Sequence, residues 1–321
     1  MGEFDLIERF FKRPVLAADL GVGDDCALLS PRPGHQLALS TDMLVEGRHF
    51  LSTVDPAHLG HKSLAVSLSD LAACGAEPRA FLLSLSMPRA DEAWLTGFSQ
   101  GLLTLADAHG CELVGGDTTQ GPLNISITVI GDVPRGQALL RSGARPGDDI
   151  YVSGTLGDAR LALEAFRGRL SLSESVFHAC RLRMEQPTPR VALGMALRGV
   201  ASAAADISDG LLGDLGHILQ QSGVGARVQV EVCEQLLACR NEIALSPSWL
   251  RTCTLSGGDD YELVFTAPPS LRDAVQQASQ QACTAVTRVG HIVDTAGIEL
   301  VDSLGQRLNE RFPSFDHFAR D

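Results

Sequence analysis

Short aspartate motifs are spread along the whole chain, and nearly all of them adjoin glycine, serine or threonine. Several follow an apolar run that predicts a buried strand. Carboxylates on glycine-bent turns supply the oxygen ligands that Mg²⁺ takes, and Mg²⁺ usually shares them with substrate phosphates. The pattern therefore predicts a Mg²⁺-dependent enzyme that acts on phosphates. The motifs are Gly23-Asp24-Asp25, Ser40-Thr41-Asp42, Ser69-Asp70, Gly115-Gly116-Asp117, Asp206-Ile207-Ser208-Asp209-Gly210 and Gly257-Gly258-Asp259-Asp260.

Ordinary turn chemistry is the alternative explanation for each motif taken alone, because Asp caps backbone amides and Gly accepts positive φ. The recurrence of the motif, mostly at the predicted ends of strands, favours a functional explanation. Asp24 and Asp260 are the weaker members of their pairs. Asp158 and Asp214 are predicted to be helix-surface or turn residues.

The charge balance indicates what such a site would do. If the acceptor of a phosphoryl group is itself a phosphate, two anions must approach each other against Coulomb repulsion. Lys12 and Lys62 are the only lysines of the chain, so metal ions would have to cancel this charge. Ser40 and Thr41 could add carbonyl or hydroxyl ligands. The candidate metal carboxylates are Asp25, Asp42, Asp70, Asp117, Asp206 and Asp209.

The composition excludes several other classes of protein. A net charge of −13 and a pI of about 5.1 argue against a broad nucleic-acid surface, which needs clustered Lys and Arg. The chain contains neither a lysine-centred phosphate loop nor a Gly-x-Ser-x-Gly nucleophile elbow. No apolar run predicts a membrane span, and the segment 1–13 lacks the apolar core of a signal peptide. Eight cysteines without a Cys-x-x-Cys pair predict reduced thiols in a cytoplasmic protein.

The apolar patterns predict an α/β chain in two halves. A strand over 36–40 is expected to end in Thr41-Asp42, and the strand 113–114 leads into Gly115-Gly116-Asp117. Asp55-Pro56 predicts the start of a helix that carries Asp70 among apolar neighbours. A short strand over 202–205 delivers Asp206. Predicted domains are 1–135 for metal and ATP binding and dimerisation, a linker at 136–148, and 149–321.

These motifs, in this order, resemble the thiamine-monophosphate kinase family over essentially the whole chain. Each string alone is unspecific, but the set together is highly specific. Beyond the aspartate motifs above, the matching strings include Gly2-Glu3-Phe4, Met43-Leu44-Val45-Glu46-Gly47-x-His49-Phe50, Leu71-Ala72-Ala73, Thr118-Thr119, Arg141-Ser142-Gly143-Ala144 and Tyr261-Glu262-Leu263.

The resemblance implies a fold shared with aminoimidazole ribonucleotide synthetase, in which the N-terminal sheets pair in a homodimer and the C-terminal α/β domain closes over the nucleotide. It implies direct transfer of the ATP γ-phosphate to thiamine monophosphate, the final step of thiamine diphosphate synthesis. Asp25, Ser40, Thr41, Asp42, Asp70, Asp117, Asp206 and Asp209 then resemble Mg²⁺ ligands. Gly116, Asp117, Arg141 and Ser208 resemble ATP contacts, and His49, Asp259 and Phe315 resemble substrate contacts.

One departure from the family pattern concerns the substrate. The family often has Glu where this chain has Asp259, so the acid is kept but is one methylene shorter. Another ATP-using synthetase of the same superfamily is the alternative function. Selenophosphate synthetases usually carry a reactive Cys or selenocysteine in an N-terminal glycine-rich loop, and the segment before Gly21 has no cysteine. A non-catalytic Ca²⁺ buffer lacks support, because the chain has no EF-hand pattern.

Overall fold

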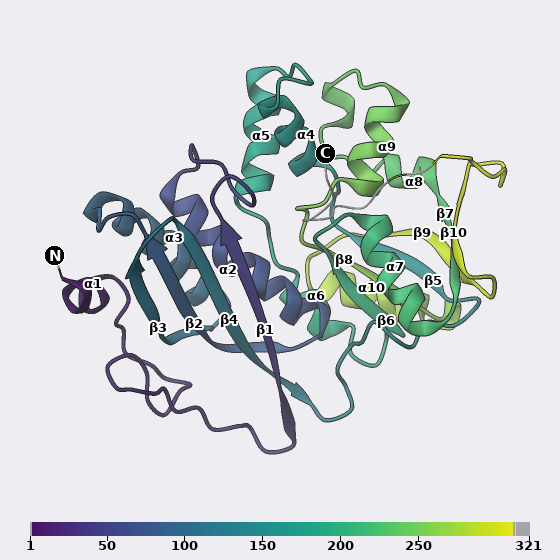
Figure 1. The fold of residues 1–321 in the computed structure, drawn as a ribbon. Helices are drawn as coiled ribbons and strands as arrows, with labels where there is room; N and C mark the ends of the chain where they lie inside the picture. The colour runs from purple at the N-terminus through teal and green to yellow at the C-terminus, as the bar shows by residue number, and fades with distance from the viewer. Residues whose placement is uncertain (1, 311, 313–321) are drawn as a thin grey trace. The chain divides into compact units, whose positions relative to one another are not determined.

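The computed structural model describes residues 2–310 and Phe312. The chain divides into two compact units (Figure 1). The first unit comprises the described residues of Met1–Leu71 and Ala76–Gly136, and the second those of Ala72–Gly75 and Gln137–Asp321. Among the described residues, no helix is both long enough and apolar enough to cross a membrane.

The first unit is built on a four-stranded sheet in the order β1-β4-β2-β3. The helices α2 (Pro56–Ala73) and α3 (Glu92–Ala108) lie against one face of this sheet (Figure 1). The pairs β1–β4 and β4–β2 are antiparallel, and β2–β3 is parallel. The helix α1 (Glu3–Phe10) precedes the sheet. The strands are β1 (His35–Val45), β2 (Glu77–Met87), β3 (Glu112–Gln120) and β4 (Asn124–Pro134).

Two glycines allow the helices of this unit to approach closely. A Cβ on Gly60 of α2 would lie 2.0 Å from the carbonyl oxygen of Phe98. A Cβ on Gly101 of α3 would lie 1.8 Å from the carbonyl oxygen of Ala57. Because both obstacles are backbone atoms, no larger side chain fits. Most of α2 is therefore buried between α3 and the sheet, and this burial includes Leu59, Leu64 and Leu68.

The second unit is built on a six-stranded mixed sheet in the order β10-β7-β9-β5-β8-β6. One core joins apolar residues of these strands to the helices α7 (Leu211–Ser222) and α8 (Val230–Glu234). The strands are β5 (Asp149–Ser153), β6 (Ala203–Ile207), β7 (Gly225–Gln229), β8 (Glu262–Ala267), β9 (Val286–Val293) and β10 (Gly297–Val301). The other helices are α4 (Asp158–Phe166), α5 (Glu174–Glu185), α6 (Val191–Ala196), α9 (Pro247–Ser256) and α10 (Arg272–Gln281).

The α/β architecture with two sheets confirms the predicted fold class. Two local predictions are wrong. β1 does not end before Thr41, because its pairing with β4 continues from His35 to Val45. Asp117 likewise lies inside β3 and not after a strand.

Candidate metal and phosphate site

Two acidic side chains meet between β1 and α2 in the first unit. β1 presents Ser40 and Asp42 toward α2, which carries Ser67 and Asp70. The Ser40 hydroxyl donates a short hydrogen bond to Asp70, and the Ser67 hydroxyl donates one of 2.8 Å to Asp42. The long-range pairing thus brings together three of the residues predicted to bind metal. Their carboxylates and hydroxyls are oxygen ligands of the kind that Mg²⁺ takes.

The electrostatics of this pair fit a cation. Burial and the charge of Asp70 raise the pKa of Asp42 to about 6, although the hydrogen bond from Ser67 opposes the change. Two carboxylates in a partly desolvated place destabilise each other's charged form. A divalent cation would remove this repulsion, so the residues present suit the predicted metal.

Asp117 lies on the opposite face of the same sheet. The register places Met43, Ser126, Ser84 and Asp117 in one row across the four strands. Residues paired directly across strands share a face, so Asp117 points away from the face that Asp42 occupies. The row lines a hollow on the open face of the sheet, together with Val45, Leu85, Ser86, Thr119, Pro122, Leu123 and Asn124.

Thr41 also belongs to the open face, where its hydroxyl is 2.8 Å from that of Thr128. The sheet therefore separates the predicted ligands of the first unit into two groups. Ser40, Asp42 and Asp70 lie on the helix side, whereas Thr41 and Asp117 lie on the open side.

Gly116 has a structural reason to be glycine. Its φ is +147°, and a Cβ at this position would lie 1.8 Å from the carbonyl oxygen of Leu83 on β2. A β-bulge follows Phe81 in the pairing of β2 with β3. The close approach of the two strands sets the direction of Asp117, the next residue.

Two further predicted residues of the first unit lie in loops. Asp25 is exposed in a loop, and its N–H donates to the Asp24 carboxylate at 2.8 Å. The Leu20–Leu28 bridge closes this loop. His49 is half-buried, and its Nδ1 accepts a hydrogen bond of 3.0 Å from the N–H of Val45. His49 is therefore bonded to a residue that lines the same hollow as Asp117.

In the second unit, β6 carries the predicted ligand Asp206 to its C-terminal end, as expected. Asp206 is buried, and the half-buried Ser208 and Asp209 follow in the turn before α7. Ligands gather at this end of strands in α/β folds. The turn therefore places a buried and a half-buried carboxylate next to the predicted ATP contact.

The residue that organises this turn is Asp214, which the sequence pattern predicts only as a helix-surface or turn residue. Asp214, in the first turn of α7, is buried and accepts N–H hydrogen bonds from Ser208, Asp209 and Gly210, at 3.0, 3.0 and 3.1 Å. Burial and the charge of Asp209 raise its pKa to about 7. An acid four to six residues beyond an Asp-Gly turn is the local signal that could have identified it, because Asp commonly accepts hydrogen bonds from nearby amides.

The loop that carries Asp259 is attached to the same turn. The N–H of Asp259 donates to the carbonyl of Ser208 at 2.7 Å, and the N–H of Tyr261 donates to the carbonyl of Ile207 at 2.8 Å. Asp259 and Tyr261 have φ values of 63° and 52°, a region that non-glycine residues rarely adopt. Such strain persists only where surrounding contacts hold it, and it is common at functional sites.

The remaining predicted contacts are Arg141 and Phe315. Arg141 is exposed, and its carbonyl accepts a hydrogen bond of 3.3 Å from the Ser222 hydroxyl. Phe315 lies outside the described residues.

A second cluster of possible metal ligands combines one carboxylate with two thiols. Among the described residues, Asp158, Cys180 and Cys239 bring their ligand atoms within 4.8 Å of one another. The Asp158 carboxylate also accepts backbone N–H hydrogen bonds from Ala238 and Cys239 at 3.3 and 3.4 Å. Thiols are soft ligands that Mg²⁺ does not favour, so this group is distinct from the predicted site. Asp158 is buried, so its predicted surface position is wrong.

Comparisons with known proteins place both units. Residues 23–133 match the N-terminal domain of AIR synthase related proteins, and residues 145–303 match the C-terminal domain. The thiamine-monophosphate kinase of Salmonella typhimurium is 45% identical over 99% of this chain and 98% of the relative. This chain belongs to the thiamine-monophosphate kinase family. The family is confirmed as the sequence motifs predicted.

Solved structures of this family show the same fold. The thiamine-monophosphate kinase of Stenotrophomonas maltophilia K279a has a TM-score of 0.83 and 46% identity, covering 88% of this chain and 91% of that one. The complex of AaThiL with AMPPCP and TMP has a TM-score of 0.74 and 28% identity, covering 98% and 96%. The thiamine-monophosphate kinase fold therefore extends over both units of the chain.

Proposed function

We propose that this protein transfers the γ-phosphate of ATP to thiamine monophosphate, giving thiamine diphosphate and ADP. The observation that carries the proposal is the placement of the Asp42 and Asp70 carboxylates beside the Ser40 and Ser67 hydroxyls, where burial and the charge of Asp70 raise the pKa of Asp42. Full-length similarity to thiamine-monophosphate kinases supports the substrates. The AaThiL complex supports them further, because it was solved with AMPPCP and TMP.

The reaction needs alignment and cancellation of charge more than covalent help from the protein. The terminal phosphate oxygen of thiamine monophosphate attacks the γ-phosphorus, and the bond to the β-phosphate oxygen of ATP breaks. A phosphate monoester is mostly ionised at neutral pH, so no general base is required. Bound Mg²⁺ supplies charge neutralisation and holds phosphate oxygens.

Each predicted residue has a proposed role. Asp42 and Asp70, with Ser40, would hold metal on the helix side of the first sheet. Asp25, Thr41, Asp117, Asp206 and Asp209 are the further proposed metal residues. Gly116, Asp117, Arg141 and Ser208 would contact ATP. His49, Asp259 and Phe315 would contact thiamine monophosphate, and the Asp259 carboxylate has the charge to pair with the thiazolium cation.

The open face of the first sheet suits a homodimer. Leu39 and Met43 of β1 are 63% and 55% exposed, and Leu37 is 40% exposed. β1 is also an edge strand of its sheet. Exposed apolar residues on an edge strand favour pairing with another chain. We further propose that this homodimer is a cytoplasmic enzyme and that it has no nucleic-acid or membrane partner.

Phosphorus NMR of the purified protein with ATP, Mg²⁺ and thiamine monophosphate tests the function. Thiamine diphosphate together with an equal amount of ADP is the expected product. ADP and free phosphate without thiamine diphosphate would contradict the proposal and favour a sister synthetase lacking its acceptor. A melting temperature that nucleotide raises only with Mg²⁺ present is the expected binding result.

A further inference from the structure

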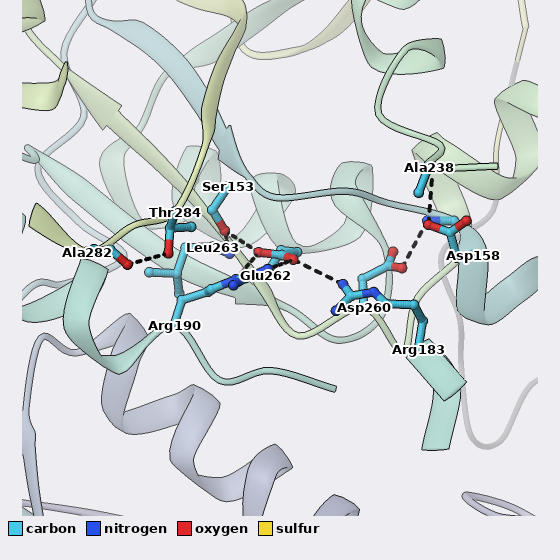
Figure 2. Close-up of polar contacts among 11 residues, drawn as sticks. Ser153, Asp158, Arg183, Arg190, Ala238, Asp260, Glu262, Leu263, Ala282 and Thr284 are labelled. Carbon is cyan, nitrogen blue, oxygen red and sulfur yellow. Dashed lines mark hydrogen bonds and ion pairs between the residues drawn. The ribbon is translucent and has the colours of Figure 1, made fainter. Parts of the chain in front are cut away.

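Glu262 forms the centre of a buried ion cluster at the start of β8 (Figure 2). The Glu262 side chain is fully buried and accepts two hydrogen bonds of 2.6 Å from Arg190 Nε and Nη2. A third comes from Arg183 Nη2 at 3.1 Å, and a fourth from the Ser153 hydroxyl at 2.6 Å. The Ser153 oxygen itself accepts the N–H of Leu263 at 2.8 Å. The carboxylate is thus held by donors from β5, α5 and the start of α6.

The cluster holds its geometry tightly. Gly154 has a φ of +54°, and a Cβ there would lie only 2.1 Å from Glu262 Oε1. The backbone of Gly154 therefore packs directly against the carboxylate. Buried ion clusters often add little net stability over apolar packing, because desolvation offsets the Coulomb attraction. Four hydrogen bonds from three residues on separate elements do, however, restrict where the chain at Glu262 can lie.

The segment held in this way carries Asp259. Two residues before Glu262, the buried Asp260 accepts the N–H of Gly157 at 2.9 Å. The acids at 260 and 262 are therefore both fastened to the body of the second unit. Asp259 precedes them with a left-handed φ of 63°, and Tyr261 between them has a φ of 52°. This backbone is strained, so it depends on anchors at both ends.

We propose that Glu262, held by Arg183 and Arg190, is a positioning residue that directs Asp259 toward the thiamine end of the substrate. The inference rests on the proposed function, in which Asp259 contacts thiamine monophosphate. Glu262 itself is fully buried among arginines and Ser153, so its side chain offers no exposed surface to a substrate. It acts by holding the loop 257–261 in the conformation that presents the carboxylate of Asp259.

The first variant is Glu262→Gln, which keeps the shape and removes the charge. We expect KM for thiamine monophosphate to rise roughly tenfold, with a smaller change in kcat, because the substrate contact is misplaced while the metal residues remain. Asp149→Asn is the matched control. Asp149 is a buried carboxylate bound by Arg272 and Arg288 at the opposite end of β5, so its loss should lower the melting temperature without changing KM.

A glycine variant tests the same point without changing charge. Gly154→Ala should push the Glu262 carboxylate from its place and raise the same KM. Gly168→Ala is the control, because Gly168 also has a positive φ of +69° but has nothing within 4 Å of the added Cβ. The control should have a lower melting temperature because of backbone strain, but its KM should stay within about twofold of the wild-type value.

A double-variant cycle decides whether Glu262 acts through Asp259. If it does, Glu262→Gln should raise KM in the wild type but not in an Asp259→Ala background. Equal effects of Glu262→Gln in both backgrounds would overturn the inference. If KM is unchanged in both Glu262→Gln and Gly154→Ala but rises in Asp259→Ala, the inference about Glu262 is overturned while the proposed substrate contact of Asp259 stands. An unchanged KM in Asp259→Ala would overturn the proposed substrate contact and the inference with it.

Discussion

The backbone N–H of Asp259 donates a 2.7 Å hydrogen bond to the carbonyl oxygen of Ser208. The proposed substrate contact and the proposed ATP contact therefore belong to loops that are bonded to each other. A second hydrogen bond, from the N–H of Tyr261 to the carbonyl of Ile207 at 2.8 Å, also joins the two loops. A displacement of one loop must displace the other, so we expect substitutions in either loop to affect the binding of both substrates.

Asp42→Asn should stabilise the metal-free protein while it removes activity. Its carboxylate is destabilised by burial and by Asp70, so the neutral amide relieves repulsion. We expect the melting temperature without Mg²⁺ to rise and kcat to fall at least about a hundredfold. Saturating Mg²⁺ should raise the melting temperature of the wild type more than that of the variant. A variant that keeps wild-type turnover at low Mg²⁺ would contradict the metal role.

The same residue predicts a pH dependence. Asp42 has a folded-state pKa raised to about 6, so the folded protein retains a proton there that the unfolded chain releases near pH 4. Stability of the metal-free wild type must therefore fall as pH rises through this window. The loss is on the order of 3 kcal/mol and is complete above the folded-state pKa.

Urea unfolding of the metal-free wild type and of Asp42→Asn between pH 4 and pH 7 measures this difference. The advantage of the variant should grow with pH and then level off. An advantage that stays constant over the range would show that Asp42 does not titrate as the geometry implies.

Asp214 should be needed for the turn at Ser208. Asp214→Ala leaves three backbone N–H groups without their acceptor, and each such group costs about 1–3 kcal/mol when buried. We expect a lower melting temperature and a higher KM for ATP. Asp214→Asn retains a side-chain oxygen and should recover much of both losses. An Ala variant with unchanged KM for ATP would show that the turn keeps its form without Asp214.

Gly116→Ala should disrupt the approach of β3 to β2. The new Cβ would overlap the Leu83 carbonyl, so the strands must separate near Asp117. We expect loss of stability by about 2 kcal/mol or more and weaker nucleotide binding, measured by denaturant unfolding and by calorimetry. Gly136→Ala is the control, because Gly136 has a positive φ of +75° with nothing within 4 Å. Similar losses in both variants would assign the effect to backbone strain alone.

Leu39→Glu should weaken the proposed homodimer. Leu39 is 63% exposed on the open face of β1, so the substitution adds charge there without removing a buried core residue. Light scattering should show a dimer for the wild type and a monomer for the variant at the same concentration. Glu299→Gln, on the β10 edge of the second unit, offers a control that should remain dimeric. A wild type that is monomeric at all concentrations would contradict the dimer.

Local sequence signals located most elements and the general character of the site. Asp55-Pro56 predicted the start of α2, and Ser202 onward predicted the strand that delivers Asp206. Local sequence propensity gave the wrong strand end where pairing with a strand distant in the sequence determines the structure. β1 continues through Thr41-Asp42 because each of its residues, up to Val45, pairs with a residue of β4 that lies 79 to 99 positions later in the chain.

The sequence by itself determined the family, the aspartates and their turns, because caps, glycine turns and apolar runs act over a few neighbouring residues. Only the tertiary structure decided which of these acidic side chains are buried and toward which face of a sheet they point. Asp42 and Asp117 lie on opposite faces of one sheet, a relation that the register of four strands sets. Glu262 gained its importance from donors that folding brings to it from 72 to 109 residues away. No local pattern can specify contacts of that range.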